Sequence, residues 1–400
     1  MNPGRRDVPI HRNTLQKAGA NTTMSNNKRR DPIKLILVLT LVLAILTGAV
    51  YFAGNFITQF REELLADKQA EVQAANEQLK QEYALELAEF EKEQAAGANK
   101  AWPAQKTEGW DVVDLTHYPL ENAGYVTVRR GDVINGGLLL VNEWHSRPAD
   151  FAEDALVSIG ENSKDVIGVR NYSQKLFPQA VEALVAALTD AKAVGLEHYV
   201  VDDAYRTYAE QEALFNKTME KYASRYEGDA LIARTKKEVN YPGTSEFNSG
   251  LSFTLYLYAR GNDAVNDQLF STSEQGKWLY ENSWKYGLVF RFPKADFPLP
   301  GTEDKSYKTG VSLSLNCFRY VGKAHAAVMN HLNLCLEEYI EYLQEHPHIA
   351  VFENGVKKFE ITRQQVGDDA SSFPVEINRL TNNYTMSLDN MGGLITVYEY

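Results

Sequence analysis

The sequence PGTSEFNSGLSFTL, from Pro242 to Leu255, carries the most specific information about the fold of this chain. Its first half, with Ser245 and Glu246, indicates a loop, and at Phe253 it enters a predicted strand that continues to Tyr258. Two other segments also combine a short strand with a turn or a helix start. They are VVDDAYRTYAEQ, from Val200 to Gln211, and TGVSLSLNCFRYVGKAHA, from Thr309 to Ala326.

Together the three segments resemble the VanY-like D-alanyl-D-alanine carboxypeptidases. The corresponding stretches of that family read S-G-Y-R-S-Y-x-x-Q, P-G-x-S-E-H-x-x-G-L-A-x-D and T-G-x-x-x-E-P-W-H-x-R-Y-V-G. The residues that match without a gap are Ser245, Glu246, Gly250, Leu251, Thr309, Gly310, Arg319, Tyr320, Val321 and Gly322. The resemblance extends from about Trp102 to Tyr400, and it implies an α+β domain of the VanY/Hedgehog-type zinc peptidase fold.

The resemblance also implies three zinc ligands and a general base, and this chain departs from the family at all four positions. The ligand positions hold Phe247, Thr254 and Cys317, and the position of the base holds Ser314. A catalytic zinc ion needs three protein ligands with nitrogen, sulfur or carboxylate donors. Phenylalanine has no lone pair, threonine is a weak neutral donor, and serine cannot replace a carboxylate as proton acceptor. We therefore predict a degenerate site without a metal cofactor.

Arg206 is the residue of the first segment that points to ligand binding. In the family the corresponding Arg lies beside the substrate pocket, and a guanidinium suits the carboxylate of a D-Ala-D-Ala terminus. The alternative is an ion pair with Asp202 or Asp203 that only stabilises the fold. Ser245 and Glu246 either line the pocket or lie exposed in a loop. The predicted ligand-binding residues are Tyr205, Arg206, Gln211 and Ser245.

Other cysteines and histidines give weaker signals. Cys317 and Cys335 are the only two cysteines, too few for a disulfide scaffold, and they form either one bridge or two buried thiols. His346 and His348 flank Pro347, where a solvated loop is a simpler explanation than a rebuilt metal site.

The N-terminal part of the chain predicts a membrane anchor. Leu35 to Ala53 contains no charged residue, which is long enough for a transmembrane helix, assigned to residues 35–56. Residues 1–34 hold eight Lys or Arg and two Asp, a net charge of +6 that predicts a cytoplasmic tail. A cleaved signal peptide is the alternative. Because the whole chain carries −12, the remainder carries −18, which argues against a nucleic-acid partner.

Residues 57–96 contain no Gly or Pro and have apolar residues at helical spacing, which predicts a helical stalk. The stalk is either a parallel coiled coil that makes a homodimer or a single amphipathic helix. Residues 97–108 are predicted to be a linker, and residues 109–400 an extracytoplasmic domain with a β-rich C-terminal extension. Within it we predict strands at Leu138–Asn142, at the start of YVVDDAYRTY (199–208) and at Phe253–Tyr258. The predicted helices are Gln179–Ala193, Ala209–Tyr222 and one long helix from Gly322 past Ile340. A helix and a strand are expected within Trp278–Pro293, and a β-rich tail over Gly355–Tyr400.

These observations support three functional hypotheses. The first is a membrane-anchored, extracytoplasmic pseudoenzyme that binds a peptidoglycan stem peptide or a wall-assembly partner. The second is a working D-Ala-D-Ala carboxypeptidase with zinc ligands outside the expected positions. The third is a structural membrane scaffold in which the stalk matters and the pocket has no role.

Overall fold

The structure, a computed structural model, describes residues 40–48, 51–52, 108–311, 314–367 and 370–400. The chain divides into two compact units, Met1–Lys100 and Ala101–Tyr400. In the first unit, the described residues 40–48 and 51–52 are helical. Among the described residues, no helix has both the length and the apolar character needed to span a membrane. The tail, the stalk, most of the linker and much of the span 35–56 lie outside the described residues, so they stay predictions.

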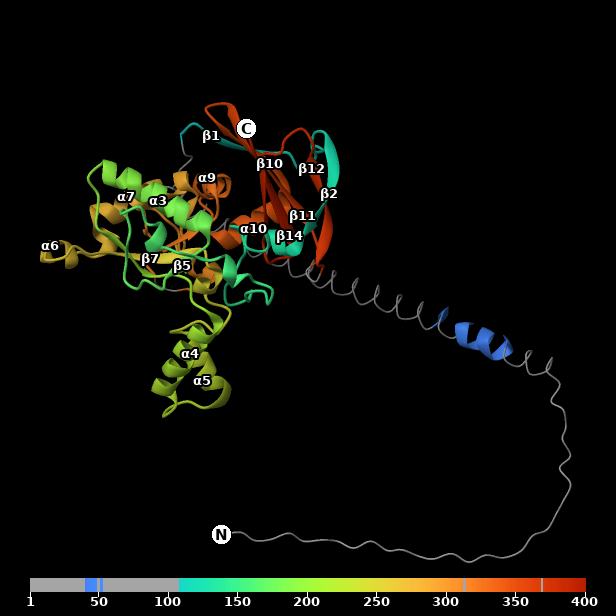
Figure 1. The fold of residues 1–400 in the computed structure, drawn as a ribbon, viewed down its shortest axis with the longest axis horizontal. Coiled ribbons are helices and arrows are strands. Elements are labelled where there is room, and N and C mark those ends of the chain that lie inside the picture. The colour runs from blue at the N-terminus through green and yellow to red at the C-terminus, as the bar shows by residue number, and fades with distance from the viewer. Residues whose placement is uncertain (1–39, 49–50, 53–107, 312–313, 368–369) are drawn as a thin grey trace, which may run out of the picture. The chain divides into compact units, whose positions relative to one another are not determined.

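The second unit contains a five-stranded sheet, called the central sheet below, and its strand β7 (Ser252–Leu257) is labelled in Figure 1. Its strand order is β4 (Gly168–Val169), β6 (Tyr199–Asp203), β7, β9 (Cys317–Tyr320) and β8 (Leu288–Phe290). Only the β4–β6 pair is parallel. The helices α3 (Pro178–Ala193) and α7 (Glu274–Asn282) contribute to the same hydrophobic core as β6, β7 and β9. The strand predicted at the start of residues 199–208, the strand Phe253–Tyr258 and the helix Gln179–Ala193 are confirmed.

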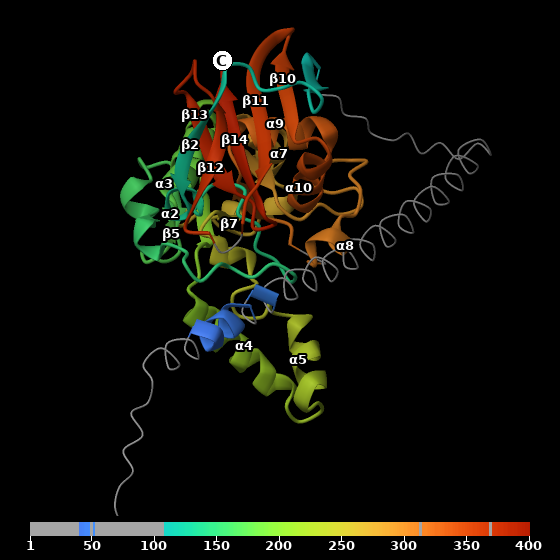
Figure 2. The ribbon, with the colours of Figure 1, turned by 90° about the vertical axis from the view of Figure 1, so that its right-hand side faces the viewer.

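The β-rich C-terminal tail is confirmed, and it pairs with the start of the same unit. A second sheet has the order β1 (Trp110–Asp114), β10 (His348–Glu353), β11 (Val356–Gln365), β14 (Gly393–Glu399) and β13 (Tyr384–Leu388). A separate ribbon pairs β2 (Ala123–Arg129) with β12 (Ser372–Asn378). Figure 2 shows β10, β11, β13 and β14 of the second sheet and the β2–β12 ribbon in the same region of the unit. Because β1 and β2 are paired with C-terminal strands, the tail is part of the domain.

The long helix predicted after Gly322 is wrong. The chain forms α9 (Lys323–Leu332) and α10 (Leu336–Glu345), separated by Asn333 in a left-handed conformation with φ of 54°. Asparagine tolerates this conformation better than most residues, and it ends helices for this reason. The backbone N–H of Cys335 then donates to the carboxylate of Glu338 at 3.0 Å and starts α10.

The predicted strand Leu138–Asn142 is also wrong, although Leu138 to Val141 are fully buried as expected for apolar residues. This segment pairs with no strand among the described residues, and its backbone groups are satisfied partly by side chains and partly by single backbone contacts, such as the N–H of Leu140 to the carbonyl of Asp389 at 3.2 Å. The Arg319 guanidinium donates to the carbonyl of Leu139 at 2.6 Å. The Asn390 amide donates to the carbonyl of Leu140 at 2.7 Å.

A hairpin of two helices projects from the body of the second unit (Figures 1 and 2). It consists of α4 (Tyr208–Tyr222), which matches the predicted helix Ala209–Tyr222, and α5 (Gly228–Lys236). The hydroxyl of Thr207 accepts from the backbone N–H of Glu210 at 3.1 Å, so the start of α4 is capped. The other short elements are α2 (Arg130–Val133), β3 (Val157–Ser158), β5 (Lys175–Leu176), α6 (Asp263–Asn266) and α8 (Ser306–Thr309).

His325 gives the packed core a dependence on pH. Its Nδ1 lies 2.7 Å from the hydroxyl of Tyr339, its side chain is buried, and burial lowers its pKa to about 3. Below pH 6.5 the unfolded chain binds a proton that the folded chain excludes. The stabilisation by neutral His325 is therefore complete above pH 6.5 and is lost as the pH falls toward 3.

We expect His325→Gln to flatten the acid limb of the stability curve. Between pH 6 and pH 4 the variant should lose stability more slowly than the wild type, by about 1.4 kcal/mol per pH unit, because glutamine does not titrate. Urea unfolding at several pH values measures these slopes, with the exposed His117→Gln as control. Equal slopes in wild type and His325→Gln would contradict this assignment.

Candidate functional site

The three sequence segments converge at one end of the central sheet. The first forms β6 and the start of α4, the second forms a turn and β7, and the third includes β9 and the start of α9. In the ladder, Asp203 lies opposite Thr254, and Thr254 lies opposite Cys317. Adjacent strands thus place two of the positions where the family signature has zinc ligands directly beside each other.

The third ligand position lies on the turn that enters β7. Residues Glu246–Ser249 form a 3-10 helix that ends at Gly250, whose φ is 69°. A Cβ at Gly250 would lie 2.8 Å from the side chain of Leu156, so only glycine fits there. This turn holds Phe247 half-buried, with its ring centroid 5.1 Å from the guanidinium carbon of Arg206.

The side chains at the ligand positions do not fit a catalytic zinc ion. Phe247 supplies no donor, and the hydroxyl of Thr254 already accepts from the backbone N–H of Asp203 at 3.1 Å. Cys317 is fully buried, and burial, together with the charge of Glu246, raises the pKa of its thiol. Zinc binds the thiolate, which this environment disfavours. Among the described residues, no group of three or more His, Cys, Asp or Glu side chains is arranged to hold a metal ion.

Glu246 anchors the turn from inside the protein. Its side chain is 5% exposed, so the alternative of a solvent-exposed loop is wrong for this residue. One carboxylate oxygen accepts from Arg291 Nε at 2.7 Å, and the other accepts from Arg319 and from the hydroxyl of Ser252. Burial alone would raise the pKa of Glu246, but the charges of Arg291 and Arg319 lower it to about 2.

The same charge network continues to α10. The two terminal nitrogens of Arg291 donate to Glu337 at 3.0 Å and 2.6 Å, and Asn142 donates to Glu337 at 3.1 Å. Asn142 and Glu337 also line a pocket of about 270 Å³ beside the exposed Trp144 and Tyr307. The network therefore connects the turn that carries Glu246 to Arg291, which follows β8, and to Glu337 of α10. Glu337 in turn lines the neighbouring surface pocket.

Arg206 is held on three sides at the start of α4. It lies over the ring of Phe247, its Nη2 donates to the carboxylate of Asp203, and its Nη1 donates to Gln211 Oε1 at 2.7 Å. The predicted alternative of an ion pair with Asp203 is thus present. Burial raises the pKa of Asp203, and the charge of Arg206 opposes that shift.

The other predicted ligand-binding residues mostly support this arrangement. Gln211 is 1% exposed and donates to the carbonyl of Asn240 at 2.7 Å while it accepts from Arg206. Ser245 is 2% exposed, which corrects the alternative of a solvent-exposed loop for this residue as well, and its backbone N–H donates to Asn248. Tyr205 is half-buried, and its hydroxyl accepts from Arg147 Nη1 at 2.8 Å. Direct contact of these three side chains with a ligand stays a prediction.

The two cysteines are buried in the fold, and the two histidines that flank Pro347 lie beside carboxylates. Cys317 and Cys335 are both buried free thiols, so the alternative of a bridge is not realised. His346 Nδ1 lies 2.9 Å from the carboxylate of Asp114, and His348 begins β10 with Nε2 2.7 Å from Glu360. His348 is 8% exposed, which corrects the expectation that it lies in a solvated loop.

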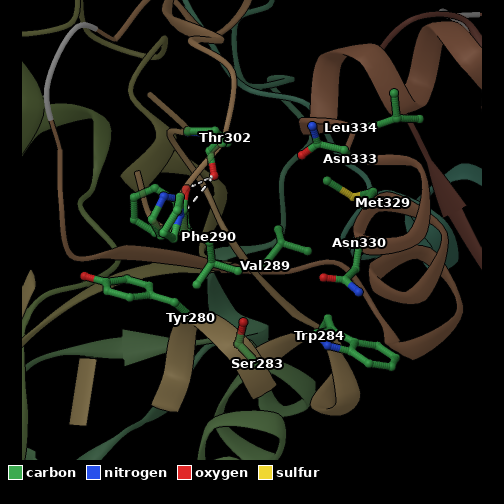
Figure 3. A pocket seen from close by; sticks show the side chains of 15 residues that line it. Tyr280, Ser283, Trp284, Val289, Phe290, Thr302, Met329, Asn330, Asn333 and Leu334 are labelled. Atoms are coloured by element: carbon green, nitrogen blue, oxygen red, sulfur yellow. Dashed lines mark hydrogen bonds between the residues drawn. The ribbon is translucent and has the colours of Figure 1, made fainter. Parts of the chain in front are cut away.

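A small pocket of about 100 Å³ lies elsewhere in this unit (Figure 3). Trp284, Val289 and Phe290 form one wall, and residues of α9 and the turn after it, including Met329 and Asn333, form the other. Its lining among the described residues includes none of the predicted site residues, so we do not assign the candidate site to it.

Comparison with known proteins shows the family to which this chain belongs. A D-alanyl-D-alanine carboxypeptidase of Enterococcus faecalis is 30% identical over 239 residues, which are 60% of this chain and 78% of that protein. This chain belongs to the VanY-like D-alanyl-D-alanine carboxypeptidase family. The family model described as VanY, D-alanyl-D-alanine carboxypeptidase, matches residues 173–323, which include all three segments up to Lys323.

Further relatives extend the VanY-like match beyond these segments. A D-alanyl-D-alanine carboxypeptidase of Enterococcus faecium is 29% identical over 278 residues, covering 69% of this chain and 79% of that protein. The crystal structure of the vancomycin resistance D,D-dipeptidase VanXYg with a D-Ala-D-Ala phosphinate analog has a TM-score of 0.52 and 22% identity. It covers 70% of this chain and 99% of that chain, and it shows that the α+β fold is shared.

Sequence reasoning placed the three segments together but missed most of the partners that hold them. Arg291, Glu337 and Asn142 are far apart in the sequence, and none of them lies in one of the three segments. Asp203 could have been identified from the sequence as a residue of the site, because it stands where the VanY-like signature has Ser. That acid is the side chain that the structure pairs with Arg206.

Proposed function

We propose that this protein is a non-catalytic VanY-like protein of the bacterial cell wall that binds a peptidoglycan stem peptide or a wall-assembly partner. The observation that carries the proposal is the set of side chains at the three ligand positions. Phe247 has no donor atom, Thr254 is engaged by the backbone of β6, and Cys317 is a buried thiol beside a carboxylate. Ser314 cannot act as the general base.

The buried charges around these positions support ligand binding as the role of a site that lacks the residues for catalysis. The buried charges of Glu246, Arg291 and Arg319 fix the turn that carries Phe247. A site that is fixed in advance loses little entropy when a ligand binds. Relatives named as D-alanyl-D-alanine carboxypeptidases indicate the ligand class, a stem peptide that ends in D-Ala-D-Ala.

A working carboxypeptidase is the alternative, and two measurements separate it from our proposal. It requires stoichiometric zinc in the purified protein and release of D-alanine from a stem pentapeptide. A third hypothesis, a membrane scaffold without a functional pocket, requires that stem peptides do not bind at this site at all.

We expect Arg206→Ala to weaken binding of a stem pentapeptide by about tenfold or more, because it removes the guanidinium N–H donors that lie beside Phe247. Isothermal titration of the purified full-length protein measures the dissociation constants. Arg170→Ala is the matched control, since Arg170 is an exposed arginine that pairs with Asp202 on the same strand as Asp203. Equal affinity of wild type and Arg206→Ala would contradict binding of the peptide beside Arg206 and favour the scaffold hypothesis.

The proposal includes a single-pass anchor at residues 35–56 with the N-terminus in the cytoplasm and the domain outside. It rests on the uncharged segment and the +6 charge of residues 1–34. Protease treatment of intact protoplasts tests it: the domain should be digested while an N-terminal tag stays protected. The homodimer through the stalk also stays a prediction, and the mass of the detergent-solubilised protein in light scattering tests it.

A further inference from the structure

The ion pair between Asp203 and Arg206 changes what the candidate site can recognise. Asp203 ends β6 and Arg206 lies just before α4, so the backbone itself brings the two charges together. The backbone N–H of Asp203 is also fixed by the hydroxyl of Thr254. Two departures from the family signature, Asp at 203 and Thr at 254, are therefore in direct contact.

Arg206 has no uncompensated charge for a ligand carboxylate to neutralise. Each terminal nitrogen already donates to an internal acceptor, Asp203 or Gln211. The neighbouring Arg147 pairs with Glu153, and Arg170 pairs with Asp202. A free carboxylate at Arg206 would lie beside the negative charge of Asp203, and a like charge at a binding surface opposes binding.

The pair nevertheless remains within reach of a ligand. The Arg206 side chain is 19% exposed and the Asp203 side chain is 41% exposed. The guanidinium has five N–H groups, so donors remain after its two internal contacts, and the carboxylate has lone pairs left. A donor and an acceptor side by side are complementary to an amide, whose carbonyl accepts and whose N–H donates.

We infer that this site recognises an amide in place of the free carboxylate that an arginine without an acidic partner would suit, and that Asp203, which stands where the family signature has Ser, sets this preference. The inference rests on the proposed binding of stem peptides and names the chemical form that is bound. The ligand is a stem peptide whose D-alanine end is an amide, either a primary carboxamide or a peptide bond to a further group.

Binding of three stem pentapeptides to the purified full-length protein tests the inference by isothermal titration. One peptide ends in a free D-Ala-D-Ala carboxylate, one in a carboxamide and one in an N-methylamide. Wild type should bind at least one amide about tenfold more tightly than the acid. Preference for the carboxamide over the methylamide indicates an amidated terminus, and comparable affinities indicate a continuing peptide bond.

Variants at Asp203 show whether this residue sets the preference. Asp203→Asn and Asp203→Ser should reverse it, because the freed guanidinium then attracts the carboxylate. Asp202→Asn removes the same charge from the neighbouring position and should keep the wild-type preference. The wild-type measurement tests the preference for an amide over the acid even if a variant does not fold.

Two outcomes would contradict different claims: the preference for an amide, or the binding of stem peptides itself. If wild type binds the acid as tightly as the amides, or if the Asp203 variants keep the amide preference, the inference is wrong while the proposed function stands. If neither wild type nor the Asp203 variants bind any of the peptides, the proposed binding of stem peptides fails, and the inference fails with it.

Discussion

The variant Asp203→Ser/Phe247→His/Thr254→Asp/Cys317→His is expected to bind about one zinc ion per chain after gel filtration, where the wild type retains none. Residues 254 and 317 face each other across β7 and β9, and residue 247 lies on the rigid turn before β7. Two histidines and one carboxylate would complete a three-ligand site. The change at 203 is needed because Asp203 and a new Asp at 254 would repel each other.

Plasma emission spectroscopy of the dialysed protein measures the zinc content. The matched control keeps Thr254 and changes only the other three positions, which leaves two histidines and should retain far less zinc. If the fourfold variant is folded by circular dichroism and holds no more zinc than this control, positions 247, 254 and 317 do not form the metal-binding frame that we assign to them.

Arg291→Met is expected to lower the free energy of unfolding by about 3–5 kcal/mol. Arg291 is 1% exposed and lies between Glu246 and Glu337, which are themselves buried. Removing the guanidinium leaves the carboxylate of Glu337 with Asn142 as its remaining side-chain partner. A buried charge without its counterion costs far more than the pair itself contributes.

Urea unfolding followed by tryptophan fluorescence measures this loss, with Arg129→Met as control. Arg129 and Asp132 form an exposed pair on β2 and α2, so that change should cost no more than about 1 kcal/mol. The double variant Arg291→Met/Glu337→Met should recover part of the loss, because it removes the unpaired charge. Equal costs for Arg291→Met and Arg129→Met would show that the network does not hold the site.

Acid should weaken the same network. The pKa of Glu246 is about 2 in the folded protein and near 4.5 in an exposed chain. Because its folded pKa is depressed, the stabilisation by ionised Glu246 is complete above pH 4.5 and is lost as the pH falls toward 2. The contribution of this carboxylate is therefore present at neutral pH.

Local patterns in the sequence predicted the elements that depend on local chemistry. The apolar spacing of Gln179–Ala193 identifies a helix and its buried face, and the apolar and aromatic residues of β7 identify a strand. The predictions that were wrong required information from distant residues. Leu138–Asn142 resembles a strand, yet side chains such as Arg319 and Asn390 satisfy its backbone, and Asn333 breaks a helix whose apolar spacing continues.

In the candidate site too, features within continuous sequence were predicted and features that depend on distant residues were not. The family segments located Arg206, Phe247, Thr254 and Cys317, because those positions lie within continuous sequence. Burial of Glu246 could not be predicted, since its partner Arg291 and the next carboxylate, Glu337, come from other parts of the chain. Long-range pairing, as of β1 with β10, likewise has no local signal.

The zinc content of the wild-type protein tests our central claim most directly. The purified full-length protein would be incubated with excess zinc, dialysed, analysed for metal and assayed for D-alanine release from a stem pentapeptide. We predict far less than one zinc ion per chain and no release of D-alanine. About one tightly held zinc ion together with D-alanine release would contradict the account and establish the protein as a working carboxypeptidase.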